Sequence, residues 1–506
     1  MSGSDSRHSV GNVATGFSYE EPLLFEHSRP GRVGADLPRL DVPEVDPGKV
    51  LGEAALRDDL ATLPELSEID VVRHFTRLST WNASVDLGLY PLGSCTMKYN
   101  PKLNERVARL AGFGSAHPLQ PPKLLQGFLH LAYQLERHLA EISGMDRVSL
   151  QPAAGAQGEL AGIMMIRAYF QHRGESRSRI LVPDSAHGTN PASAALNGYE
   201  VISVPSGDDG ILHPEAIEAA MTPDVAALMI TNPNTLGLFE SHVPRIAEIV
   251  HARGGLVYGD GANLNPLMGI ARPGDLGTDV MHFNLHKTFS TPHGGGGPGS
   301  GPVGVKNILV PFLPTPVITR RNGGVEAEYD LDYEFQHSIG RLHAHYGNVG
   351  MMIRAYAYLR SLGPDGLRRC AEMAVLNANY LLSRLRGTYH VPYDRPVMHE
   401  CVLSDHHLAQ TGVTTLDIAK RLIDYGYHPP TIYFPLIVHG ALMIEPTESE
   451  SLEGLDRFAD ALLAIDREAR EQPELVQSAP HHTRRSRLDE TRAARNPVLR
   501  WWPEGD

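Results

Sequence analysis

Cysteine is scarce in this chain of 506 residues, which contains only Cys95, Cys370 and Cys401. Three scattered cysteines are too few for a disulfide framework or for a cysteine-based zinc site. This cysteine content suits a reducing compartment. We therefore expect a cytoplasmic protein that binds no metal.

Long apolar runs and positive charge are also in short supply. No stretch approaches the roughly 20 apolar residues that a membrane helix needs, and residues 1–13 are polar, unlike a secretory signal. The net charge is −14, whereas a nucleic-acid-binding surface needs clustered lysine and arginine to replace counterions. We therefore expect binding to neither membranes nor nucleic acids.

Helical and strand patterns alternate through the middle of the chain. Apolar residues recur at helical spacing over 122–143, 158–170 and 244–252, and short apolar runs lie at 148–150, 180–182, 201–204, 226–230 and 256–258. Short strands separated by helices predict an α/β fold, with a mostly parallel sheet between two layers of helices. Ligands of such sheets bind at the carboxyl ends of the strands.

The chain changes character on both sides of this region. Residues 1–80 are rich in proline, glycine and charge, and they predict an extended arm with one short helix at 70–78. Beyond about residue 330, helical patterns at 348–362, 366–385, 416–425 and 452–465 alternate with short strand patterns at 389–392, 398–403 and 441–444. We expect an arm over 1–80, a large domain over 81–330, a small α+β domain over 331–470 and a docking tail over 471–506.

Two segments that follow predicted strands have features of a ligand site. Residues 151–158 (Gln-Pro-Ala-Ala-Gly-Ala-Gln-Gly) place small residues between a strand and a helix, where free backbone N–H groups can bind phosphate. His187 follows the next strand, where its imidazole could stack on a flat ring. Each has an ordinary alternative: a strand-to-helix turn for the first segment and a hydrogen-bonded loop histidine for the second.

Two charged residues follow later strands. Asp260 comes after the apolar run 256–258, where its carboxylate could pair with a protonated ring nitrogen or cap the next segment. Lys287 lies in the apolar segment 283–289, and burial favours the neutral amine that forms imines. The run Gly294–Gly297 that follows lacks the Gly-Lys-Ser/Thr ending of a P-loop, so we do not interpret it as a nucleotide site.

Together these features predict a pyridoxal-phosphate enzyme. A phosphate-binding turn, a stacking imidazole, a carboxylate for the ring nitrogen and an imine-forming lysine come in this order along the chain, although none is specific alone. We therefore expect the cofactor to be held as a Schiff base on Lys287.

Several strings of residues narrow this prediction, because they resemble the P-protein of the glycine cleavage system, a family of fold-type-I pyridoxal-phosphate enzymes. The strings are residues 90–98 (Tyr-Pro-Leu-Gly-Ser-Cys-Thr-Met-Lys), 117–121, 151–157, 284–289 (Asn-Leu-His-Lys-Thr-Phe), 292–299, 443–448 (Met-Ile-Glu-Pro-Thr-Glu) and 486–490. The resemblance covers about residues 60–502. It implies an oxidoreductase that decarboxylates glycine and transfers the aminomethyl group to a lipoyl carrier.

The resemblance also implies roles for individual residues. Lys287 corresponds to the imine lysine, Asp260 to the partner of the ring nitrogen and His187 to the stacking residue, so we expect these three to be catalytic. The expected cofactor-binding set adds Ala154, Gly155, Ala156, Thr231, Ala262, Asn284 and His286. Residues expected near the substrate are Ser94, Cys95, Thr96, Lys98 and Asn234, and possible partners of the glycine carboxylate are Lys98, Arg341, His343 and His345.

Partners follow from the same resemblance. Members of this family are either one long chain or a pair of shorter subunits, and a chain of this length with the lysine corresponds to the second subunit. The expected partners are a lysine-free first subunit in an α2β2 heterotetramer, the lipoylated H-protein and glycine. Two alternatives stay open: another fold-type-I amino-acid decarboxylase or lyase, and a non-catalytic subunit that only completes a partner's site.

Overall fold

The computed structural model describes residues 21–57, 63–293, 299–321, 328–344 and 346–501. The polar N-terminus, the run Gly294–Gly297, His345 and Trp502 lie outside the described residues. The chain divides into two compact units, Met1–Ser84 and Val85–Asp506. Within the described part of the chain, no helix combines the length and the apolar character needed to cross a membrane.

The N-terminal unit is more helical than the extended arm that its composition predicts. It contains α1 (Leu24–His27), α2 (Pro47–Leu51), the 3-10 helix η1 (Glu53–Ala55) and α3 (Glu68–Ser79). A capping box starts α3, because the side chains of Ser67 and Asp70 each accept the other's backbone N–H. This reciprocal cap explains why the helix begins before the predicted 70–78.

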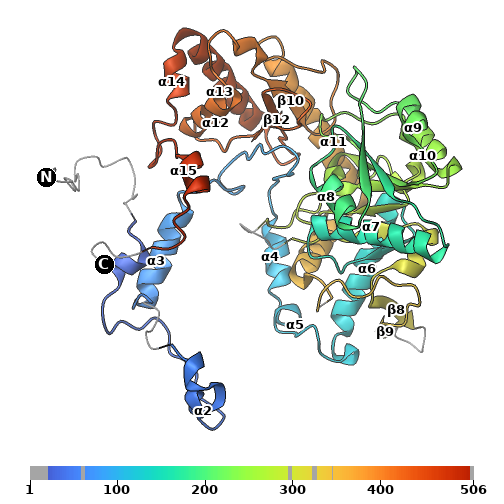
Figure 1. Ribbon diagram of the computed structural model, residues 1–506. Coiled ribbons are helices and arrows are strands. Elements are labelled where there is room, and N and C mark those ends of the chain that lie inside the picture. The colour runs from blue at the N-terminus through green and yellow to red at the C-terminus, as the bar shows by residue number, and fades with distance from the viewer. Residues whose placement is uncertain (1–20, 58–62, 294–298, 322–327, 345, 502–506) are drawn as a thin grey trace. The chain divides into compact units, whose positions relative to one another are not determined.

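A seven-stranded sheet forms the centre of the second unit (Figure 1). Its strands are β1 (Arg147–Ser149), β2 (Arg179–Pro183), β3 (Glu200–Val204), β4 (Val225–Thr231), β5 (Leu256–Asp260), β6 (Val280–His282) and β7 (Val303–Val305), in the spatial order β1-β7-β6-β5-β4-β2-β3. Neighbouring strands from β3 to β6 run parallel, and β7 is antiparallel to both β6 and β1. The predicted α/β fold with a mostly parallel sheet is confirmed.

Helices cover both faces of this sheet. They are α6 (Gln126–Ser143), α7 (Gly155–His172), α8 (Thr189–Leu196), α9 (Pro214–Ala220) and α10 (Val243–Ala252). The buried strand β4 shows how the layers arise, because alternate side chains enter different cores. Met229 packs in the core under α7, while Leu228 and Ile230 pack in the core under α9 and α10.

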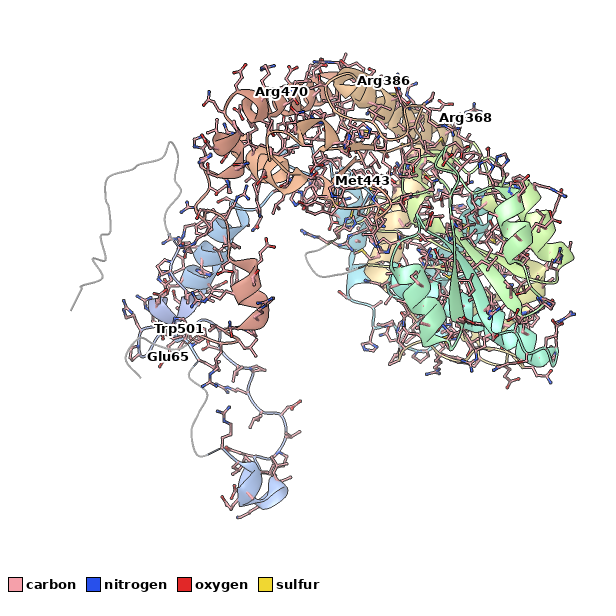
Figure 2. The ribbon with its side chains drawn as sticks, turned by 45° about the horizontal axis from the view of Figure 1, so that its top comes forward. Glu65, Arg368, Arg386, Met443, Arg470 and Trp501 are labelled. Carbon is pink, nitrogen blue, oxygen red and sulfur yellow. The ribbon has the colours of Figure 1, made fainter. Side chains whose placement is uncertain are left out.

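The C-terminal part is a smaller α+β region around a three-stranded antiparallel sheet of β10 (Cys401–Ser404), β12 (Ala441–Ile444) and β11 (Thr431–Ile432). Its helices are α11 (Val349–Leu385), α12 (Thr415–Asp424), α13 (Leu452–Glu471), α14 (Pro473–Gln477) and α15 (Glu490–Arg495). Figure 2 shows Met443 of β12 within this region and Arg386 and Arg470 at its outer edge.

Two predictions for this region need comment. The separate helices predicted at 348–362 and 366–385 form α11, which is interrupted at Gly363 (φ +64°), directly before Pro364. The strand predicted at 389–392 is wrong. Only two isolated bridges form there, one between Tyr389 and Arg386 and one between His390 and Ser404.

The remaining elements are short. They are α4 (Lys102–Ala108), α5 (Ala111–Gly114), the hairpin β8 (Val317–Arg321) and β9 (Glu328–Asp332), and the 3-10 helices η2 (Pro122–Leu124), η3 (Gly261–Asn263), η4 (Asn265–Leu267), η5 (Pro273–Leu276), η6 (Asn307–Phe312) and η7 (His406–Leu408). The predicted helix at 122–143 thus begins as η2 and continues as α6.

A buried carboxyl group on α6 gives the fold a measurable pH dependence. Glu136 accepts a hydrogen bond from Tyr346, and burial raises the pKa of Glu136 to about 8. At a pH between about 4.5 and about 8, the Glu136 carboxyl therefore keeps its proton in the folded state and loses it in the unfolded state. Relative to Glu136→Gln, the free energy of unfolding of the wild type should fall by several kcal/mol as the pH rises from about 4.5 to about 8.

Urea unfolding of both proteins at a series of pH values measures this difference. Parallel stability curves for the wild type and Glu136→Gln would show that the Glu136 carboxyl titrates normally in the folded protein.

Candidate active site

A cavity of about 270 Å³ lies at the carboxyl ends of β4, β5 and β6, where parallel strands present their loops. The structure brings together eleven of the predicted site residues in its lining: Ser94, Ala154, Gly155, Ala156, His187, Thr231, Asp260, Ala262, Asn284, His286 and Lys287. The lining also includes Glu159, Thr189, Thr235, Asn263 and His282.

The predicted phosphate turn is the start of α7. Ala154 is extended and caps the helix without a side-chain hydrogen bond, so the first backbone N–H groups of α7 lack a capping side chain. A Cβ atom added to Gly155 would lie 2.0 Å from Asn284 Oδ1. Only glycine fits at this first helical position.

Asp260 ends β5 and is 6% exposed. Its Oδ1 accepts a hydrogen bond from Ala262 N at 2.9 Å and lies 3.5 Å from His282 Nε2. The capping role that the sequence left open is therefore present. The carboxylate also lines the cavity, and the cap leaves its second oxygen, Oδ2, for other partners.

Lys287 lies in the turn after β6, and its Nζ donates to the Ser94 carbonyl oxygen at 2.8 Å. Its neighbours Phe283, Leu285 and Phe289 are fully buried. They anchor the turn in the core while the lysine side chain reaches the cavity. The amine is thus held at a defined place on the cavity wall.

Burial keeps the histidines around the cavity uncharged at neutral pH. It lowers the pKa of His286 to about 3 and that of His282 below its ordinary value. Burial also lowers the pKa of His187. Its ring lies edge-on to Phe434, with 5.6 Å between the ring centroids. A neutral imidazole on the cavity wall suits contact with an aromatic ring.

The lining fits pyridoxal phosphate on observations of this site. Thr231 Oγ1 and Asn284 Oδ1 are buried and have no hydrogen-bond partner among the described residues. Buried polar atoms are normally paired, so both await a ligand. Three further groups line the same cavity. They are the start of α7, which can bind a phosphate, the Asp260 carboxylate, which can pair with a ring nitrogen, and the Lys287 amine, which can react with an aldehyde.

Four residues predicted to lie near the substrate are not among the residues that line the cavity: Cys95, Thr96, Lys98 and Asn234. Buried Lys98 donates to Glu448, Asn265 and Tyr358, which leaves its ammonium group no free donor for a substrate. Asn234 is likewise buried and bonds Gly210 O and Glu240 through its nitrogen.

The segment Ser94–Thr96 is held by acids that sequence reasoning missed. Glu400 Oε2 accepts Ser94 N at 2.7 Å, and Glu445 accepts Thr96 N at 2.9 Å. Ser94 (φ +64°) and Thr96 (φ +48°) both adopt a conformation that non-glycine residues rarely take. Burial raises the pKa of Glu445 to about 7, and burial together with the neighbouring Glu445 carboxyl raises the pKa of Glu400 well above its ordinary value. Glu445 belongs to the string 443–448, so the family resemblance was the one sequence feature that could have identified it as a site residue.

Comparison with known proteins first defines the class. Residues 158–296 match the family model of class-V aminotransferases, and residues 370–485 match that of the glycine dehydrogenase C-terminal domain. A crystal structure of the glycine decarboxylase P-protein is 21% identical, with a TM-score of 0.71 over 83% of this chain and 94% of that one. Glutamate decarboxylase of Lactobacillus brevis is 14% identical, with a TM-score of 0.62 over 82% and 96%. The chain has the fold of the pyridoxal-phosphate enzymes of fold type I, and the predicted cofactor is confirmed.

Curated relatives then define the family. Probable glycine dehydrogenase (decarboxylating) subunit 2 of Bacillus licheniformis is 57% identical over 95% of this chain and 99% of its own length. The protein of the same description from Listeria innocua is 57% identical over 96% and 98%. The chain belongs to the family of glycine dehydrogenase (decarboxylating) subunit 2, the P-protein of the glycine cleavage system. The alternative of another decarboxylase or lyase is therefore wrong.

Proposed function

We propose that this chain holds the catalytic site of the glycine-decarboxylating enzyme and passes the aminomethyl group to the lipoyl arm of an H-protein. The observation that supports this most is the single cavity that collects Lys287, Asp260, His187 and the start of α7. These are the groups that the chemistry requires, and they come from four separate segments of the chain.

Each residue has a distinct task in this proposal. Pyridoxal phosphate, when bound, supplies an electron sink for the electrons left when glycine loses carbon dioxide. Lys287 Nζ would hold the cofactor and can carry a proton to or from the reacting carbon. The Asp260 carboxylate would keep a proton on the ring nitrogen, His187 would contact the ring, and the N–H groups at the start of α7 would bind the phosphate.

Several neighbours keep the lysine and the ring in place. The Ser94 carbonyl oxygen accepts from Lys287 Nζ and so sets where the free amine rests. The buried hydroxyl of Thr231 and the amide of Asn284 offer hydrogen bonds to the cofactor. The neutral His286 is a further hydrogen-bonding group on the wall that does not add charge.

The relatives carry the name subunit 2, which implies a companion chain in those proteins. We propose the same here: a lysine-free first subunit in an α2β2 heterotetramer, located in the cytoplasm and acting with a lipoylated H-protein. The absence of a suitable span among the described helices is compatible with this location.

Exchange of labelled bicarbonate into glycine tests the proposed function. The assay combines this chain with the companion subunit and lipoylated H-protein, and it omits each component in turn. The proposal predicts exchange only with all three. Exchange that persists without this chain would instead indicate a non-catalytic subunit.

Gly155→Ala tests the phosphate-binding turn. The added Cβ would collide with Asn284 Oδ1, so the start of α7 must move and cofactor affinity should fall about 10- to 100-fold. Gly127→Ala is the matched control, because a Cβ at this helical glycine meets nothing within 4 Å. Titration of the apoprotein with pyridoxal phosphate measures both, and equal affinities would place the phosphate elsewhere.

A further inference from the structure

A buried glutamate beside the active site has no task in the mechanism above. Glu159 lies on α7 shortly after Gly155, is 1% exposed and lines the same cavity as Asp260 and His187. A carboxyl group in such a place costs free energy unless its oxygens are hydrogen-bonded. Its partners therefore indicate what it does.

Two hydrogen-bonded links run from Glu159 to the two residues expected to contact the cofactor ring. Thr189 Oγ1 donates to Glu159 Oε2 over 3.1 Å, and the backbone N–H of Thr189 donates to His187 Nδ1 over 3.2 Å. The Asn190 amide lies between the two carboxyls. Oriented with its nitrogen toward them, it lies 3.0 Å from Glu159 Oε2 and 3.2 Å from Asp260 Oδ2, and its two N–H groups can serve both, whereas the opposite orientation would face its oxygen to two acceptors. The Glu159 Oε2 atom is thus linked to His187 through Thr189 and to Asp260 through Asn190.

We propose that Glu159 is a positioning residue for the cofactor ring, fixing His187 through Thr189 and Asp260 through Asn190. The inference rests on the proposed function, since it takes His187 and Asp260 as the ring's contacts. The link through Asn190 is rigid, because Asn190 is 0% exposed and its side chain is enclosed between the two carboxyls.

The site should also respond to the charge of Glu159. Burial, and to a smaller extent the Asp260 carboxylate, raises the pKa of Glu159 to about 7. The groups that face Glu159 or its neighbours are Asp260 and Tyr258 from β5, His282 from β6, His187 from the loop before α8, and Lys287 across the cavity. Loss of the proton adds negative charge beside Asp260, which favours a protonated ring nitrogen.

Two variants separate the charge of Glu159 from its hydrogen bonds. Glu159→Gln keeps an oxygen that can accept from Thr189 and Asn190 but cannot titrate. Glu159→Ala removes both links. Glu240→Gln is the matched control. Glu240 is also 1% exposed and accepts a hydrogen bond from an asparagine amide, and burial raises its pKa to about 7. Unlike Glu159, it is not among the residues that line the cavity.

The test records the absorbance of the bound cofactor against pH, the cofactor dissociation constant, and kcat and KM for glycine in the assembled enzyme. We expect the wild type and Glu240→Gln to show a spectral inflection near neutral pH that Glu159→Gln lacks. Glu159→Ala should lower kcat about tenfold while KM for glycine changes little, because hydrogen bonds to a charged group are lost.

Two failures can be told apart. A wild type without any bound-cofactor absorbance would overturn the proposed function. A wild type with that absorbance, whose pH profile is unchanged in Glu159→Gln, would overturn the role of Glu159 alone. If Glu159→Ala does not fold, the Glu159→Gln profile decides the matter.

Discussion

Lys287→Ala should abolish the long-wavelength absorbance of the bound cofactor and stop catalysis. Lys287 is the lysine whose Nζ reaches the cavity wall, where it donates to Ser94 O. Without this amine the aldehyde carbon has no covalent partner, and the proton shuttle is lost. Loss of a covalent catalytic group typically costs a factor on the order of 10⁴ to 10⁶ in kcat.

Lys102→Ala is a suitable control, because Lys102 is a surface residue paired with Asp86. It should keep both the absorbance band and the activity. Absorption spectra of the reconstituted proteins and the exchange assay measure the two effects. A normal band in Lys287→Ala would mean that another group holds the cofactor.

Asp260→Ala should keep the cofactor bound but slow decarboxylation severely. The carboxylate at the end of β5 faces the cavity and holds a proton on the ring nitrogen in the proposed arrangement. Removing one such preorganised charge typically costs about 10²- to 10³-fold in kcat.

Asp260→Asn separates charge from shape. Its side-chain oxygen can still accept from Ala262 N, so the cap of η3 is kept while the charge is lost. Steady-state kinetics should show both variants impaired, with KM for glycine little changed. An Asp260→Asn enzyme with near-normal kcat would restrict Asp260 to its capping role.

Much of this site could be predicted because it depends on local sequence. Short apolar runs ended by Asp260 or followed by His187 predict strands whose loops gather at one edge of a parallel sheet. A run of small residues before a helix pattern predicts the turn at Gly155. The residues of these strand ends meet because parallel pairing aligns them, and the structure brings them together in one cavity.

The rest depends on contacts between distant segments that no local pattern encodes. Glu400 and Glu445 reach Ser94 and Thr96 across more than three hundred residues. Lys98 was predicted near the substrate from its string, but Glu448, which lies 350 residues further along the chain, takes up its ammonium group. Glu159 was hidden in an ordinary helix pattern, since only the fold shows which side of α7 faces the cavity.

The strand β7 was not predicted, for a different reason. It has three residues, too few for an alternating pattern to show. The chain holds β7 between β1 and β6 by antiparallel pairing on both sides, and this depends on the sheet as a whole.

Reduction of the reconstituted protein with borohydride, followed by peptide mapping by mass spectrometry, tests the central claim most directly. Borohydride converts an imine into a stable amine, so the lysine that held the cofactor keeps it through digestion. The account predicts the cofactor's mass on the peptide that contains Lys287. Its appearance on another lysine, such as Lys98, or on none, would contradict the account.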